Sequence, residues 1–469
     1  MSWYKPLKNK YTICVMAIIL ALVCLCACAS DKDDESEPAD SEPSAVLDVS
    51  EEVSEEESVA PPVTELDLTD KGSGELSQVL EHTELEKLNI NGREFENLSV
   101  LSECSKLAWL DARGNKLDAA TYEALRVALP ECEILWDVPL LGNAYDCASE
   151  ELELPTEGEF AYADFENIKY FPNLTELDLR QWSFTVEEMD ALTESVPNVK
   201  LIFAFEYANQ QWDGYTQSVD LRGNVLNDDV KLRQYLRHMH GLEYIDMCDC
   251  GLDNDTMDAL RTDFPKVKFV WTVYLGQWKI RTDRVAFSTL IGEHTVYTKL
   301  TSEMIEPLKY CTELVALDLG HQAISDVSVI GTLTNLQILI LADNNIKDIS
   351  PLANLKNLRF IELFINYGIE SFEPLSGMTK LLDLNIFYIM PKEDYSALYS
   401  LTSLERLWIG GYYIAPSIIE EVKANMPEGC VVDATAAIDS TGNGWRSHKR
   451  YWPMMTMFYY DVIEPSFFY

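Results

Sequence analysis

The sequence predicts an α/β solenoid in which short parallel strands stack along one side and short helices lie along the other. Two internal repeats predict this fold. A unit of 22 residues recurs around residue 340, and a longer unit of about 67 residues recurs between residues 100 and 270. Neither unit can bury its own apolar face, so neighbouring units must stack to share a core. We expect roughly fifteen coils between Val63 and Val432.

The clearest short unit runs from Leu333 to Leu352 and restarts at Leu355. Leu339 and Leu341 are two residues apart, so both point into the core when they lie on a strand. Asn344 follows where the chain must turn, and its amide can bond backbone groups that the coil leaves open. The unit resembles the internalin-type leucine-rich repeat, including the Asp-Ile-Ser-Pro-Leu ending. The resemblance implies a curved parallel sheet on the concave side, with helices and turns on the convex side.

The longer unit contains a helix. The segments Leu117–Pro130, Phe184–Pro197 and Leu252–Pro265 each have a polar start and a proline just past the end, which is typical of short helices. Thr185 and Glu188 have the spacing of a capping box. The pattern predicts helices near residues 119–129, 185–196 and 254–264, each followed by a β-rich run.

Asparagine recurs at one position of the coil. Asn115, Asn224, Asn344 and Asn366 occupy this position, and Cys250 and Gln322 stand there in other coils. A residue type that returns at the same phase indicates that the turns are stacked, so we expect the asparagines to form a ladder along the solenoid.

The first residues predict export. Lys5, Lys8 and Lys10 precede an apolar run, Ile13–Leu25, that is short for a transmembrane helix. Leu25-Cys26-Ala27-Cys28 resembles the lipobox of bacterial lipoproteins. The resemblance implies cleavage before Cys28 and a diacylglycerol on its thiol, which would hold the chain on the outside of a bacterial cell membrane. An ordinary signal peptide is the alternative.

Composition divides the rest of the chain. Residues 28–62 are acidic and poor in large apolar side chains, so we expect a tether that cannot form a core. Residues 63–435 are the predicted solenoid, after the signal peptide of residues 1–27 and the tether, and residues 436–469 form an aromatic C-terminal cap or tail. A second binding element is the alternative reading of that tail.

The formal net charge is −42, from 78 acidic and 36 basic side chains. Such a balance opposes nucleic-acid binding, which depends on Lys and Arg at phosphates. It favours a cationic partner, or a surface kept soluble by repulsion.

No sequence motif of a hydrolase, a phosphate-binding loop or a dinucleotide site is present, so we expect no enzyme and no cofactor. We also expect no metal site. Cys104 and Cys311 take positions filled elsewhere by Leu, which favours buried thiols over disulfides. The interpretation is a non-catalytic protein that recognises a protein partner, such as a host or cell-wall component. A surface hydrolase and a solute-capturing lipoprotein are the rivals.

Two sets of residues point outward from the predicted concave strands. The first is an acidic strip of Asp111, Asp178, Asp220, Asp246 and Asp318. Arg113, Arg180 and Arg222 each follow an Asp by two residues and can compensate locally. The strip is interpreted as a solubility device, a site for a cationic ligand, or a site for bridging calcium.

The second set is aromatic and lies in the C-terminal coils: Phe360, Phe364, Phe387, Tyr388 and Trp408. Contiguous exposed rings usually mark a binding surface or a covered one. We expect the principal partner-binding surface here. The competing expectation is that the tail from Trp445 to Tyr469 folds back over these rings.

Overall fold

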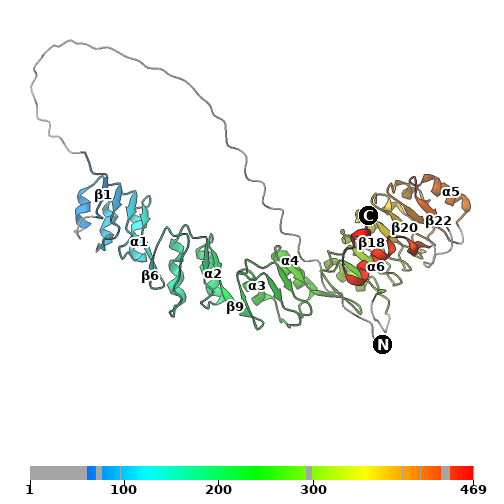
Figure 1. The fold of residues 1–469 in the computed structure, drawn as a ribbon, viewed down its shortest axis with the longest axis horizontal. Coiled ribbons are helices and arrows are strands. Elements are labelled where there is room, and N and C mark those ends of the chain that lie inside the picture. The colour runs from blue at the N-terminus through cyan, green and yellow to red at the C-terminus, as the bar shows by residue number, and fades with distance from the viewer. Residues whose placement is uncertain are drawn as a thin grey trace, which may run out of the picture. The chain divides into compact units, whose positions relative to one another are not determined.

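The computed structural model describes residues 61–69, 76–95, 97–291, 298–392, 394–411, 414–434 and 444–467. Two units are distinguished, residues 1–61 and 62–469, and every element below belongs to the second (Figure 1). The predicted signal peptide, Cys28 and nearly all of the predicted tether lie outside the described residues. Among the helices that are described, none is long and apolar enough to span a membrane.

Three-residue strands form four parallel sheets. In each sheet every strand pairs with the next strand in the chain, one strand per coil. The sheets are β1 (Glu65–Asp67), β2 (Lys87–Asn89), β3 (Trp109–Asp111) and β4 (Glu133–Leu135); β7 (Glu176–Asp178) and β8 (Lys200–Ile202); β11 (Ser218–Asp220), β12 (Tyr244–Asp246) and β13 (Lys268–Val270); and β16 (Ala286–Ser288), β17 (Ala316–Asp318), β18 (Ile338–Ile340), β19 (Phe360–Glu362), β20 (Asp383–Asn385), β21 (Arg406–Trp408) and β22 (Val431–Asp433).

The register of the strands places one core residue per coil. Leu88 pairs with Leu110, and Leu317 with Leu339, and all four are fully buried. The first and third residues of each strand point the other way, and the surface that they form is called the sheet face here. The fold is therefore an α/β leucine-rich-repeat solenoid, as the sequence predicts.

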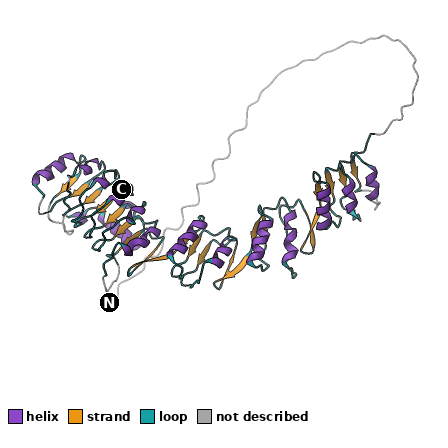
Figure 2. Ribbon diagram, turned by 180° about the vertical axis from the view of Figure 1, so that it is seen from behind, coloured by secondary structure: helices purple, strands orange, loops and turns teal. Residues whose placement is uncertain are grey.

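Helices cover the opposite side of the core (Figure 2). The three predicted helices are confirmed, and Asp118, Thr185 and Asp253 cap them by accepting backbone N–H bonds. The helices on this side are α1 (Ala119–Ala128), α2 (Val186–Ser195), α3 (Val230–Leu236), α4 (Asn254–Asp263) and α5 (Pro416–Asn425). Turns of 3₁₀ helix take their place in the other coils: η1 (Leu76–Glu81), η2 (Leu98–Glu103), η3 (Tyr162–Tyr170), η4 (Glu303–Tyr310), η5 (Ile330–Thr332), η6 (Ser350–Asn354), η7 (Glu373–Leu375) and η8 (Ser396–Ser400).

The asparagine ladder is confirmed in three of its four predicted coils. The Asn344 amide donates to the carbonyls of Leu319 (2.9 Å) and Leu341 (3.1 Å), and its oxygen accepts from the Ile324 N–H at 3.0 Å. Asn115 and Asn366 make the same kind of bonds. Asn224 is half-buried, and its side chain makes no such bond within the described part of the chain. Each ladder amide thus ties its own turn to the preceding coil.

Three antiparallel hairpins, which the repeat phasing does not predict, follow β4, β8 and β13. They are β5 (Asp137–Leu140) with β6 (Asn143–Asp146), β9 (Ala204–Tyr207) with β10 (Gln210–Asp213), and β14 (Thr272–Leu275) with β15 (Trp278–Arg281). Two-residue turns join their strands, and Leu141, Gly142, Ala208 and Asn209 all have positive φ, as primed hairpin turns require. Parallel pairing stops at each hairpin, so the strands form four sheets rather than one continuous sheet.

A charged clamp fastens each hairpin to a preceding strand. Arg113 joins Asp111 to Asp146 of the first hairpin, at 2.6 and 2.8 Å. Arg180 joins Asp178 to Asp213 in the same way, at 2.7 and 3.1 Å. In the third block the arginine has moved to the hairpin, where Arg281 lies 2.7 Å from Asp246. In the first two blocks the arginine follows the strand and the hairpin carries the aspartate, whereas in the third block the hairpin carries the arginine. The attraction between strand and hairpin is kept in all three, which indicates that this contact positions the hairpin.

Candidate recognition surface

The predicted acidic strip has a local structural cause. Each of its five carboxylates accepts a hydrogen bond from the backbone N–H two residues further on, at 3.0 to 3.2 Å. Asp makes this bond readily where a strand ends in a turn. The preference for Asp at this position therefore follows from turn geometry, a reason that the sequence pattern alone does not reveal.

The strip is not uniformly exposed. Asp178 and Asp220 are exposed, whereas Asp111, Asp246 and Asp318 are buried. The predicted compensation by arginine is confirmed, because Arg113, Arg180 and Arg222 each bond the Asp two residues before them. The hydrogen bonds from Arg222 lower the pKa of Asp220 to about 2. Asp111, Asp178 and Asp220, whose pKa values are all lowered, are therefore ionised and already paired at neutral pH.

The sheet face of the first coils also carries charges of both signs. Lys87 on β2 pairs with Glu65 on β1 at 2.9 Å, and Lys200 on β8 pairs with Glu176 on β7 at 2.9 Å. The Lys87 and Glu65 side chains remain 56% and 67% exposed. Exposed pairs of this kind contribute little to folding, so they are available to a partner at small cost.

The predicted aromatic surface is not exposed, and that expectation is wrong. Phe360, Phe364, Phe387 and Trp408 are buried, and Tyr388 is half-buried. The tail covers them, as the competing expectation has it. It comprises η9 (Trp445–Ser447), α6 (Tyr451–Tyr460) and η10 (Pro465–Phe467). In Figure 1, α6 lies beside the sheet that contains β18. The side chains of the tail that form one core cluster with the rings and with neighbouring strand residues are Trp445, Met454, Met457, Phe458 and Phe467.

A buried ionic network fixes the tail to β20. Arg450 is 4% exposed and donates to both carboxylate oxygens of Asp383, at 2.7 and 2.9 Å, and Asp383 is fully buried. Arg450 also reaches Glu405 at 2.6 Å. Arg406 of β21 bonds the same Asp383, and its guanidinium lies 4.2 Å from the centre of the Trp445 ring. Two arginines therefore neutralise one buried carboxylate, and one of them comes from the tail.

The tail makes two further polar anchors. The Trp445 indole N–H donates to Glu362 of β19, which is buried. At the other end of the sheet, Asp461 accepts the N–H groups of Val285 and Ala286, both at 3.0 Å. Ala286 begins β16, the first strand of its sheet, and Val285 directly precedes it, so Asp461 satisfies donors at an open edge.

In the part of the chain that the structure describes, one buried polar atom beneath the tail lacks a hydrogen-bond partner. The amide nitrogen Nδ2 of Asn385 is buried and makes no hydrogen bond among the described residues. Asn385 lies on the sheet face, paired with Glu362 on one side and Trp408 on the other. A buried donor left without an acceptor costs about 1–3 kcal/mol, so the tail is an imperfect complement of this surface.

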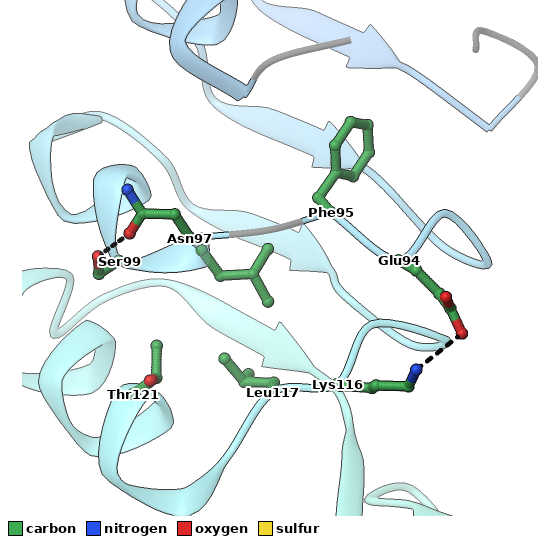
Figure 3. A pocket seen from close by; sticks show the side chains of 8 residues that line it. Glu94, Phe95, Asn97, Ser99, Lys116, Leu117 and Thr121 are labelled. Carbon is green, nitrogen blue, oxygen red and sulfur yellow. Dashed lines mark hydrogen bonds and ion pairs between the residues drawn. The ribbon is translucent and has the colours of Figure 1, made fainter. Parts of the chain in front are cut away.

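A hollow on the helical side bears on the solute-capture rival. It has a volume of about 410 Å³ and lies between η2 and α1, lined among others by Glu94, Phe95, Ser99 and Lys116 (Figure 3). Lys116 pairs with Glu94 at 3.3 Å, and both side chains are largely exposed. The Ser99 hydroxyl donates to Asn97 rather than to a base. The hollow is therefore open to solvent, and its described lining residues bring no activated nucleophile together with an acid and a base.

The described cysteines and His238 also show no arrangement typical of a catalytic or metal site. The seven described cysteines form no disulfide, as expected, and burial raises the pKa of Cys248 and Cys311 to about 12. His238 is buried and lies 2.9 Å from Asp190, packed edge-on against Phe203. Within the described residues, no group of three or more His, Cys, Asp or Glu side chains is placed to hold a metal ion.

One comparison with known families matches the short repeat. A model of leucine-rich repeats in two copies matches residues 334–377. An internalin of Listeria monocytogenes is 17% identical over 80% of this chain and 82% of its own, with a TM-score of 0.25. A leucine-rich-repeat protein of Leptospira interrogans is 16% identical over 79% and 90%, with a TM-score of 0.26. At such TM-scores the fold assignment rests on the strand pairing and the repeat model. No protein of curated function matches significantly.

Proposed function

We propose that the chain is a non-catalytic recognition protein that binds a protein partner through the sheet face of β1–β13. One observation carries the proposal. Outward strand positions there hold exposed charges, such as Asp178, Asp220 and Lys87, and no other described segment covers them in the way the tail covers the later coils. Within each sheet the paired parallel strands hold their outward groups at fixed spacing, which suits recognition of a surface with complementary charge.

The experiment compares charge reversal on the two sides of one repeat block. Asp220→Lys alters the sheet face, and Glu194→Lys alters an exposed residue of α2 on the helical side. Partners captured from host mucosal or bacterial wall material by the unmodified chain should be lost at least ten-fold with Asp220→Lys and retained with Glu194→Lys. Equal capture by both variants would contradict the sheet face as the binding surface.

We further propose that a lipid on Cys28 anchors the protein to the outside of a bacterial membrane. The support is the lipobox-like Leu25-Cys26-Ala27-Cys28, followed by an acidic segment suited to a spacer. Cys28→Ala should move the protein from the membrane fraction into the medium, and Cys26→Ala should leave it on the membrane. Unchanged detergent partitioning of Cys28→Ala would argue against lipidation there.

A further inference from the structure

The sheet face of β16–β22 differs from that of the earlier coils in how its acids are balanced. Asp111, Asp178 and Asp220 each have an arginine two residues later. Asp318, Glu362 and Asp383 are followed at that spacing by Gly320, Phe364 and Asn385 instead. These three acids are buried beneath the tail. The tail supplies the Trp445 donor for Glu362 and the Arg450 donor for Asp383.

The tail binds this face as a helical ligand binds a groove. Its described residues add no strand to the sheet, and α6 places Met454, Met457 and Phe458 on the apolar strand residues at helical spacing. Trp445 and, five residues later, Arg450 donate hydrogen bonds to the buried acids Glu362 and Asp383 of this face. Buried Trp and Arg anchors of this kind dominate the energy of protein–protein interfaces.

Two observations distinguish the tail from a completed structural cap. It leaves the Asn385 donor without an acceptor in the described structure. In addition, α6 is apolar on both sides, because Trp452, Tyr459 and Tyr460 on its outer side are 70%, 59% and 74% exposed. A helix built only to close a solenoid would be expected to show a polar outer face.

We propose that the sheet face of β16–β22 is a second recognition groove. It is specific for a segment of a partner protein in which a tryptophan and, five residues later, an arginine precede an apolar helix, and the chain's own tail occupies this groove until such a segment displaces it. The best partner segment also offers an acceptor to Asn385. The inference deepens the proposed recognition function but does not depend on the charged face of the earlier coils.

The test uses the full chain and a synthetic peptide of residues 444–467 as the probe. Arg450→Ala weakens the internal occupant and leaves the groove intact, so the probe should bind this variant at least ten-fold more tightly than it binds the unmodified chain. Asp383→Asn damages the groove itself and should give no gain. Trp452→Ala alters only the exposed side of α6, so the internal tail should stay docked and probe binding should match that of the unmodified chain.

A second substitution in the tail distinguishes release of the tail from misfolding of the whole chain. Trp445→Ala should give the same gain as Arg450→Ala, and probes that carry either substitution should lose binding to both variants. Hydrogen exchange in β16–β22 reports whether the sheet stays folded when the tail is released. If β16–β22 unfolds with the tail in both variants, or if neither variant gains affinity for the probe, the tail is part of the core and the proposal fails. Neither result bears on partner capture by the sheet face of β1–β13.

Discussion

Asn366→Ala is expected to destabilise the coils around β18 and β19 by about 3 kcal/mol. Asn366 is fully buried. Its amide donates to the carbonyls of Leu341 and Leu363 at 2.9 and 2.7 Å, and its oxygen accepts from the Ile346 N–H at 3.1 Å. Leu341 keeps Asn344 as a second donor, so the substitution orphans two buried backbone groups. Each orphaned group costs about 1–3 kcal/mol.

Asn224→Ala is the matched control. Asn224 has the same phase in its coil but makes no ladder bond with its side chain in the described structure, so its loss should change stability by less than about 0.5 kcal/mol. Urea denaturation with hydrogen exchange resolved to β18 and β19 measures both variants, because a repeat array need not unfold in one step. Equal destabilisation by the two substitutions would show that the ladder bonds contribute little.

The strands and helices were predictable because their signals are local. A strand needs one inward Leu flanked by two outward residues, and that spacing recurs within each coil. The caps Asp118, Thr185 and Asp253 act within three residues of themselves. Stacking then follows from the repetition, since each coil exposes apolar surface that only the next coil can cover.

Two of the three hairpins were hard to predict because their turns, Leu141-Gly142 and Ala208-Asn209, begin with residues unusual at that position, whereas the third turn begins with Gly276. Leu141 and Ala208 adopt positive φ, which such residues rarely do, so neither turn resembles the Asn-Gly or Asp-Gly pairs that mark tight hairpins. The signal that could have found them is their recurrence. The turns begin at residues 141, 208 and 276, each following a β-rich run at the repeat spacing.

The covering of the aromatic rings depends on contacts between residues far apart in sequence. Trp445 reaches Glu362 across 83 positions, and Arg450 reaches Asp383 across 67. Strand phase shows that Phe360 and Trp408 point outward, but not whether water or another segment lies beyond them. Charge could have indicated the answer, because Glu362 and Asp383 lack a local arginine and the tail contains Arg446 and Arg450.

Two groups beneath the tail are expected to make its docking depend on pH, with opposite signs. Burial raises the pKa of Glu362 to about 7, an effect that nearby Asp318 increases and that the Trp445 hydrogen bond, Arg446 and Arg406 oppose. A released Glu362 would return towards its ordinary pKa of 4.5. Docking of the tail therefore takes up a proton at Glu362. The stabilisation of the docked tail by this proton is full below about pH 4.5 and is lost as the pH rises through about 7.

His448 acts in the other direction. Burial, together with the charges of Arg406, Arg450 and Lys449, lowers its pKa from 6.5 to about 4, against the opposing effect of Asp383. The His448 Nδ1 accepts a hydrogen bond from the backbone N–H of Arg450 at 3.4 Å, which requires that Nδ1 be unprotonated. Docking thus releases a proton at His448, and its contribution is present above about pH 6.5 and is lost as the pH falls through about 4.

Between about pH 4.5 and 6.5 the two effects oppose each other, so single substitutions should separate them. Glu362→Gln keeps an acceptor for Trp445 but abolishes the uptake of a proton at this position. Only the proton release at His448 then remains, so docking of the tail should weaken on acidification relative to the unmodified chain. His448→Asn keeps an acceptor for the Arg450 N–H but removes one proton released, so docking should strengthen on acidification. Asp318, whose burial also raises its pKa, is the same in both variants and leaves the comparison unchanged.

Hydrogen exchange of the α6 amides, corrected for the intrinsic pH dependence of exchange, measures the docking equilibrium across this range. Parallel pH profiles for the two variants would mean that neither side chain is linked to docking of the tail.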